Sequence, residues 1–168
     1  MKVYQTAQRY YHALPTQEAH FAQLSRGSHR PSATISFGRN LIVITMSTEP
    51  LATSTLVSEP DWYMLQIPLS YQGELIVNGW VHSGNDFYLM CGGKEWITTA
   101  QNRKFLLIGI RKEILDLACA ALLGRKTECL TLENLQIRSG PDLMYRLKKL
   151  GDWVMSASIS SAKDGGNL

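Results

Sequence analysis

Residues 62–79 carry the sequence WYMLQIPLSYQGELIVNG, and this stretch decides the fold class. It combines two runs rich in Ile, Val, Leu and aromatic side chains, of which the branched and aromatic ones suit a pleated, half-buried strand. The pairs Gln72-Gly73 and Asn78-Gly79 have the composition of turns. We therefore expect two strands, over 62–69 and 73–79.

Similar runs recur on both sides of this stretch. Gly, Pro, Asn and Asp separate them, and many strands at short intervals are typical of a sandwich or a barrel. The runs cover residues 33–37, 40–47, 53–58, 87–90 and 104–110. The predicted fold is thus mainly β, with a barrel over 33–111.

The hydrophobic period changes from strand to helix at Arg111. Over 112–123 the side chains of Ile114, Leu117, Ala118, Ala121 and Leu122 share one helical face. A second helix is expected over 141–156, with Leu143, Leu147, Leu150 and Val154 forming its apolar stripe. This helical pair, over 112–156, packs onto the barrel, forms a dimer seam, or does both. The Ser- and Gly-rich residues 157–168 are expected to form a linker.

Composition indicates one globular domain. Of 168 residues, 45% are hydrophobic and 18% charged, and the net charge of +3 is too small to indicate nucleic-acid binding over the whole surface. The three cysteines have no CxxC spacing, which predicts a reduced, cytoplasmic protein. The N-terminus lacks the apolar segment of a signal peptide, and the longest apolar runs are strand-sized, so we expect no membrane contact.

Residues 1–32 are expected to form a polar N-terminal arm, weakly helical over 6–14. The arm is locally basic, since Lys2, Arg9, Arg26 and Arg30 face a single acid, Glu18. Such a segment suits an anionic partner.

The arm ends in Arg26-Gly27-Ser28-His29-Arg30, a loop that matches RxxxR. An arginine holds a phosphate or a guanine edge by two parallel hydrogen bonds, and its plane stacks on a purine. Two arginines four residues apart can approach one bulky ligand from two directions. RxxxR is similar to the motif by which PilZ-type domains bind cyclic di-GMP. The second motif of those domains is not intact here, because residues 34–38 keep only Ser36 and Gly38 of it.

The sequence therefore allows two interpretations of these residues: a ligand-binding site, or a role without any ligand. The candidate ligand-binding residues are Arg26, His29, Arg30, Ser36 and Trp80, the last presenting its ring to a base beside the 78–79 turn. In the alternative, the arginines lie in a solvated loop and Trp80 is a core or rim aromatic.

Catalytic and metal motifs are missing from the sequence. The four histidines, His12, His20, His29 and His82, lack the close spacing of a metal site in a barrel. No G-x-S-x-G occurs, and no His is placed to activate a Ser or Cys. We expect a protein that is not an enzyme and holds no metal or other cofactor.

Residues 62–123 resemble the ligand-binding domain of AraC/XylS-type transcription regulators. The resemblance rests on the strand at 62–79, the turn Ser83-Gly84-Asn85-Asp86, the strand 87–90, the turn at 91–93 and the helix start LLIGIRKEIL. It implies a cupin-like barrel, a dimerising helical pair and a DNA-binding domain beyond this chain, which is then either a fragment or a naturally short protein.

The resemblance and the loop together predict a homodimeric sensor whose effector is cyclic di-GMP. Two alternatives stay open. The same domain binds a small aromatic or sugar-like effector inside the barrel, or the chain is a small cupin enzyme.

Overall fold

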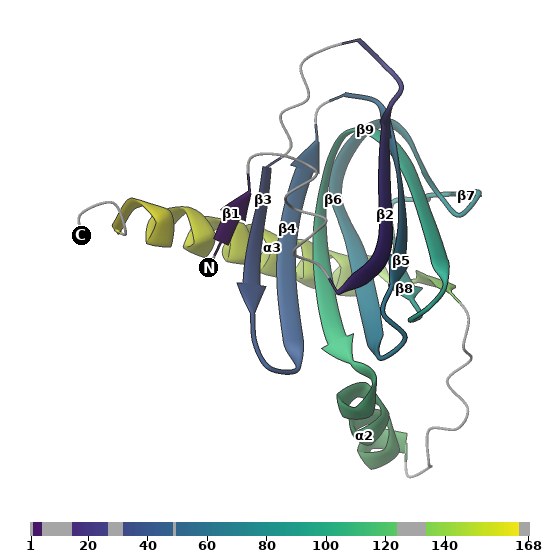
Figure 1. The fold of residues 1–168 in the computed structure, drawn as a ribbon, viewed down its shortest axis with the longest axis vertical. Helices are drawn as coiled ribbons and strands as arrows, with labels where there is room; N and C mark the ends of the chain where they lie inside the picture. The colour runs from purple at the N-terminus through teal and green to yellow at the C-terminus, as the bar shows by residue number, and fades with distance from the viewer. Residues whose placement is uncertain (1, 5–14, 27–31, 49, 124–133, 165–168) are drawn as a thin grey trace.

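A computed structural model describes residues 2–4, 15–26, 32–48, 50–123 and 134–164 (Figure 1). In this part of the chain the strands form one antiparallel sheet, and one helix follows each of the last two strands. The strands are β1 (Lys2–Tyr4), β2 (Thr16–Gln23), β3 (Ser32–Phe37), β4 (Leu41–Thr48), β5 (Ala52–Ser58), β6 (Trp62–Val77), β7 (Trp80–Val81), β8 (Asp86–Met90), β9 (Glu95–Arg111) and β10 (Leu135–Arg138). The helices are α2 (Lys112–Leu123) and α3 (Pro141–Asp164).

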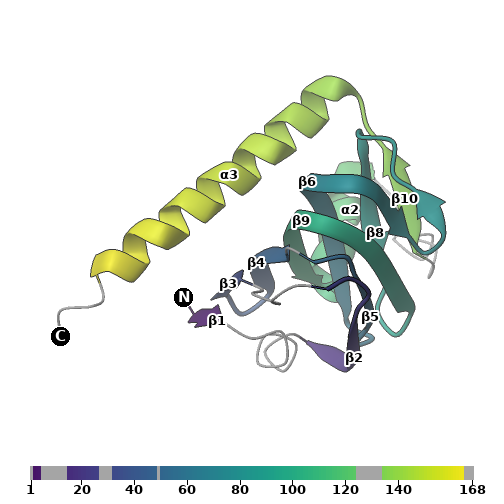
Figure 2. The same ribbon diagram turned by 90° about the horizontal axis from the view of Figure 1, so that it is seen from above.

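The two longest strands, β6 and β9, pair along most of their length and organise the sheet. The first half of β9 also pairs with β5, and its second half pairs with β4. One part of the sheet therefore runs β1-β3-β4-β9-β6-β8-β10, while β2 and β5 continue from the other half of β9 and β7 lies on β6. The sheet wraps around one core (Figure 2), which confirms the mainly β, barrel-like class with two helices.

The two long strands, β6 and β9, bend next to each other, beside the paired residues Gln72 and Gln101. Gly73 in β6 and Asn102 in β9 have positive φ angles of 69° and 45°, and the β6–β9 register shifts around them. Such irregularities turn a strand and change which side chains face inward. On β9 the buried positions are 96, 98 and 100 before the bend, and 103, 105, 106, 107 and 109 after it. The side chains that face the barrel interior therefore change from even to odd positions at the bend.

The bend corrects one expectation. Gln72-Gly73 lies inside β6, so the strands expected over 62–69 and 73–79 are one strand, because a glycine with positive φ accommodates the bend without ending the pairing. Asn78-Gly79 is a true turn, with positive φ at both residues, and joins β6 to β7.

A buried arginine next to the bend in β9 connects the neighbouring strands by hydrogen bonds. The Arg103 side chain is fully buried, and its guanidinium donates to Thr48 Oγ1 and Ser54 Oγ at 3.0 and 3.1 Å. It also donates to the carbonyl oxygens of Ala52 and Thr98. A buried cation needs such partners to offset its lost hydration, and here they join β4, β5 and β9.

β6 is buried on both faces, which explains the unbroken run WYMLQIPL. Met64 faces the main core inside the barrel, whereas Ile67 belongs to a second cluster on the outer face. That outer cluster also contains Leu106 from β9 and Met144 from α3.

α3 crosses the outer face of β6 and β4 and then projects past β1 (Figures 1 and 2). Met144 and Leu147 pack on the sheet, and Gly151 lies so close to Leu69 that an added Cβ would meet Leu69 Cδ2 at 2.6 Å. The helix continues to Asp164, whereas the sequence led us to expect its end near 156 and a linker from 157. Residues 157–164 contain no Gly or Pro, so nothing in them stops the helix.

The N-terminal region differs from the expected arm. Its described parts form β1, which pairs with β3, and β2, which pairs with β5. The helix expected over 6–14 lies outside the described residues. The helix expected over 112–123 is confirmed as α2. No helix in the described part of the chain has the length and apolar character to cross a membrane.

Candidate functional site

The predicted arginine loop is described only at its start. Arg26 is exposed just beyond the end of β2. The preceding residue is fixed to the β4–β5 connection, since the amide of Leu51 donates to Ser25 Oγ at 3.0 Å. His29 and Arg30 lie outside the described residues. Ser36 is in β3 opposite Val43.

Trp80 does not lie beside Arg26 in the sheet. Along the strand order, β2 and β7 are at opposite edges, with β5, β9 and β6 between them. The Trp80 ring packs against the barrel core and is parallel to Tyr88, with an interplanar angle of 6° and centroids 6.5 Å apart. The structure thus groups Trp80 with other residues of the barrel.

These residues form an aromatic and polar group inside the barrel, here called the interior cluster. Its members are Gln66, Tyr71, Trp80, His82, Tyr88 and Trp96. Gln66, His82, Tyr88 and Trp96 are buried, while Tyr71 and Trp80 are only partly buried. The cluster therefore meets solvent on the side of Tyr71 and Trp80.

Hydrogen bonds hold the polar groups of the interior cluster in place, except for one buried donor that has no partner within the described structure. Trp96 Nε1 donates to Gln66 Oε1 at 3.0 Å, and His82 Nδ1 shares a 3.0 Å hydrogen bond with the Tyr88 hydroxyl. Gln66 Nε2 is buried and has no hydrogen-bond partner within the described structure. An unpaired buried amide is costly, so it marks a place for an acceptor supplied from outside the protein.

Burial sets the protonation of the cluster. It lowers the pKa of His82, against the smaller opposing effect of Asp86. It also raises the pKa of Tyr88 well above its ordinary value. Both shifts favour the uncharged forms of His82 and Tyr88, because burial disfavours charge.

The turn that carries His82 also contacts the region before α3. Asp86 is fully buried, and its carboxylate accepts hydrogen bonds from the Ser83 amide and hydroxyl, from Gln136 Nε2 and from Arg138 Nε. Burial alone would raise the pKa of Asp86, but these hydrogen bonds outweigh it and lower the pKa below its ordinary value. Asp86 therefore joins the interior cluster's turn to β10, which leads into α3.

Among the described residues no group of three His, Cys, Asp or Glu side chains is placed to hold a metal ion. His20 lies exposed on β2, and His82 is bonded to Tyr88. His12 and His29 lie outside the described residues.

Sequence reasoning considered Trp80 and His82 separately and did not identify Gln66, Tyr71, Tyr88 or Trp96 as site residues. One signal was available. Gln66 is the only polar residue between Trp62 and Leu69, and an amide within a strand that is buried on both faces needs partners.

No protein-family model matches the chain, and no curated protein matches it. Among solved structures, the AraC-like transcriptional activator CuxR superposes with a TM-score of 0.49 at 14% identity, covering 89% of this chain and 54% of that one. A mutant of Bacillus subtilis oxalate decarboxylase OxdC gives 0.38 at 16% identity, covering 72% and 45%. The plu4264 protein from Photorhabdus luminescens gives 0.33 at 14% identity, covering 62% and 92%.

The chain thus spans about half the length of CuxR and of the oxalate decarboxylase.

Proposed function

We propose that this chain is the effector-sensing domain of an AraC-type transcription regulator and that it is not an enzyme. The observation that carries the sensing role is the interior cluster with its unpaired Gln66 amide. Such a set of aromatic faces and few polar groups is typical of sites for small organic molecules.

The geometry best supports an effector that is small, aromatic or sugar-like, and bound at the solvent side of the interior cluster. It would stack on Trp80 or Tyr71 and offer an acceptor to Gln66 Nε2. Since the cluster is uncharged, an effector with a hydroxyl or carbonyl group fits better than one with a buried charge.

Cyclic di-GMP is the second candidate effector, supported by the exposure of Arg26 beside a loop that carries the RxxxR motif. In that case the arginines bind phosphate or guanine at the edge of the sheet, away from the interior cluster.

One ligand screen distinguishes an effector bound at the interior cluster from cyclic di-GMP. Thermal unfolding is followed with cyclic di-GMP, GTP, aromatic acids and sugars, because a ligand at a hundred times its Kd stabilises the fold by about 2.7 kcal/mol. Gln66→Leu should abolish stabilisation by an interior effector and leave that by cyclic di-GMP unchanged. Arg26→Ala and Arg30→Ala should weaken cyclic di-GMP binding about ten- to a hundred-fold. A wild-type chain that responds to none of these compounds would contradict both assignments.

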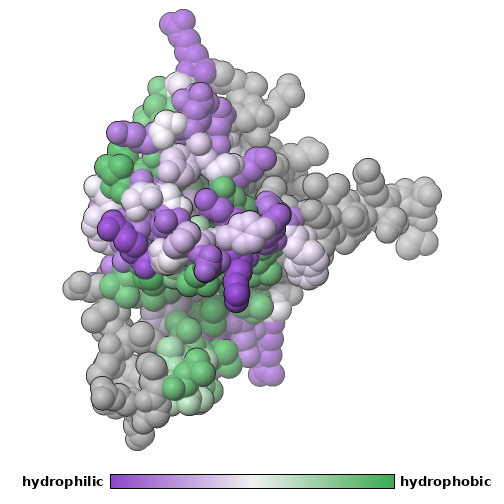
Figure 3. Space-filling view, turned by 180° about the vertical axis from the view of Figure 1, so that it is seen from behind, coloured by the Kyte–Doolittle hydropathy of each residue, from purple (hydrophilic) through white to green (hydrophobic). Residues whose placement is uncertain are grey.

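We also propose a homodimer that uses apolar helix surface. Seen from behind, the molecule has apolar surface gathered over α2 (Figure 3), where Leu117 and Leu122 are 67% and 84% exposed. On α3, Leu143, Leu150 and Trp153 are exposed beside the face that packs on the sheet. Sedimentation at tens of micromolar, with and without effector, tests this, and a monomer throughout would contradict it.

The alternative of a small cupin enzyme is tested by metal analysis of the purified chain. A tightly bound stoichiometric metal would contradict the sensing proposal.

A further inference from the structure

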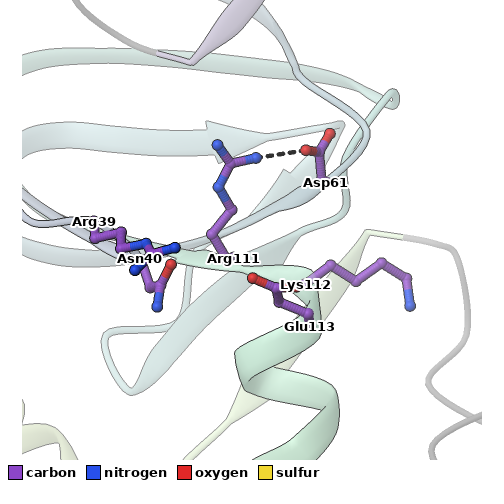
Figure 4. Close-up of a pocket in the computed structure, with 6 residues that line it drawn as sticks. All are labelled: Arg39, Asn40, Asp61, Arg111, Lys112 and Glu113. Carbon is purple, nitrogen blue, oxygen red and sulfur yellow. Dashed lines mark hydrogen bonds and ion pairs between the residues drawn. The ribbon is translucent and has the colours of Figure 1, made fainter.

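A second site lies outside the barrel, in an open cleft of about 260 Å³ at the base of α2. Its lining comes from the β3–β4 turn (Arg39, Asn40), the β5–β6 connection (Asp61), the last residue of β9 (Arg111) and the start of α2 (Lys112, Glu113) (Figure 4). We call it the α2 cleft. Drug-sized ligands occupy pockets of roughly 300–1,000 Å³, so this cleft fits a smaller molecule.

Arg111 is held in place on one side of the cleft. Its guanidinium lies over the Trp62 ring, 4.7 Å from the ring centroid, and its Nη1 donates to Asp61 Oδ2 at 2.5 Å. The backbone around it is also fixed, since the Arg111 amide donates to Asn40 O and the Lys112 amide to Asp61 O. A guanidinium has five N–H donors, so one bond to Asp61 leaves it able to bind a further acceptor.

Arg39 supplies a second cation from the opposite element. It is exposed on the β3–β4 turn, and no carboxylate of the described residues lies within ion-pair distance of it. Lys112 is different, because its ammonium is bonded to Asp116 and points away from the other five side chains (Figure 4). The cations available to a ligand are therefore Arg39 and Arg111.

Two carboxylates balance these cations. Asp61 is bonded to Arg111, and the Glu113 carboxylate points toward the side where Arg39 and Asn40 lie (Figure 4). A ligand carrying only negative charge would gain from the arginines but would be repelled by Glu113 and Asp61. A ligand with both charges satisfies both kinds of group.

We propose that the α2 cleft binds a small zwitterion of the α-amino-acid class. Its carboxylate lies between Arg39 and Arg111, and its ammonium donates to Glu113. Asn40 offers an amide beside them. The assignment is independent of the effector site in the barrel, because the two sites share no residue.

The test uses the full chain labelled with 15N and three probes at equal ionic strength: glycine, acetate and ammonium. Backbone amide shifts of residues 39, 40, 112 and 113 are followed by NMR. Glycine should give saturable shifts at these amides, and acetate or ammonium at the same concentration should give much smaller ones. Equal shifts with acetate would overturn the proposal in favour of a plain anion site, and no shift with glycine would also overturn it.

Substitutions test which side chains bind the carboxylate and the ammonium of glycine. Arg39→Met and Arg111→Met should each weaken glycine binding about ten- to a hundred-fold. Glu113→Gln should weaken glycine binding and strengthen acetate binding, a reversal that a merely structural effect would not produce. Arg146→Met, which removes an exposed arginine from α3, is the matched control and should leave binding unchanged. Because Arg39 and Glu113 are exposed, both variants should fold normally.

Discussion

The interior cluster and the α2 cleft are built on opposite physical principles. In the cluster, burial keeps His82 and Tyr88 neutral, and hydrogen bonds such as that from Trp96 to Gln66 order the side chains. In the cleft, full charges lie near solvent, and Arg39 and Glu113 are exposed. From this difference we expect substitutions in the cluster to lower the free energy of unfolding strongly, whereas substitutions in the cleft should leave it almost unchanged.

The largest effect is expected for Trp96→Ala. The Trp96 side chain is 1% exposed, packs on Tyr88 and donates to Gln66. Its removal leaves a cavity and strips the Gln66 amide of its remaining partner, so unfolding free energy should fall by about 3–5 kcal/mol. Urea unfolding measures this. Tyr145→Ala is the control, since Tyr145 is 63% exposed and its loss should change stability by less than about 0.5 kcal/mol. Equal losses in the two variants would contradict the burial argument.

A smaller effect is expected for Asp86→Asn, roughly 1.5–3 kcal/mol at neutral pH, because a buried carboxylate loses charge-assisted hydrogen bonds. The pKa of Asp86 is lowered in the folded state, so its stabilisation is complete above the unfolded pKa and is lost as pH falls through the folded pKa. The difference between wild type and variant should therefore shrink below about pH 4. Glu74→Gln, at an exposed position of β6, serves as control. A pH-independent difference would show that the charge is not responsible.

The smallest effect is expected for Arg39→Met. Its guanidinium is exposed, and such side chains contribute within about 0.5 kcal/mol to stability. Thermal and urea unfolding should match the wild type, while glycine binding should be weakened about ten- to a hundred-fold. A large destabilisation would show that the cleft, like the interior cluster, is part of what holds the fold together.

Much of the fold could be predicted from local sequence. The change of period at Arg111 placed α2 correctly, and Asn78-Gly79 gave the β6–β7 turn. β2 was missed because its sequence, TQEAHFAQ, is largely polar and owes its strand to pairing with β5. The bend at Asn102 was also missed, because Asn is only more tolerant of a positive φ than most residues, and one Asn within a strand-like run does not by itself indicate a bend.

The candidate sites were harder to predict, since both bring together residues that are distant in the chain. Gln66 and Trp96 are 30 positions apart, and Asp61 and Arg111 are 50 apart. The first contact is made across the barrel interior, since Gln66 pairs with Tyr88 and Leu107 and Trp96 pairs with Leu56. The second lies next to the pairing of Trp62 with Arg111. The arginine loop stands out in the sequence because Arg26 and Arg30 are close neighbours, and its role stays a prediction.

The close approach of Gly151 to Leu69 fixes a point of contact between α3 and the sheet. Among the described side chains of α3, those that pack on the sheet lie between Met144 and Gly151, and the start of α3 follows the segment bonded to Asp86. From Gly151 the helix continues for about 13 residues, or roughly 20 Å at 1.5 Å per residue. A change of about 10° in the helix direction at this contact would therefore displace the far end by roughly 3.5 Å, nearly one Cα–Cα step. We thus expect the position of the far end of α3 to depend strongly on how tightly Gly151 packs against Leu69.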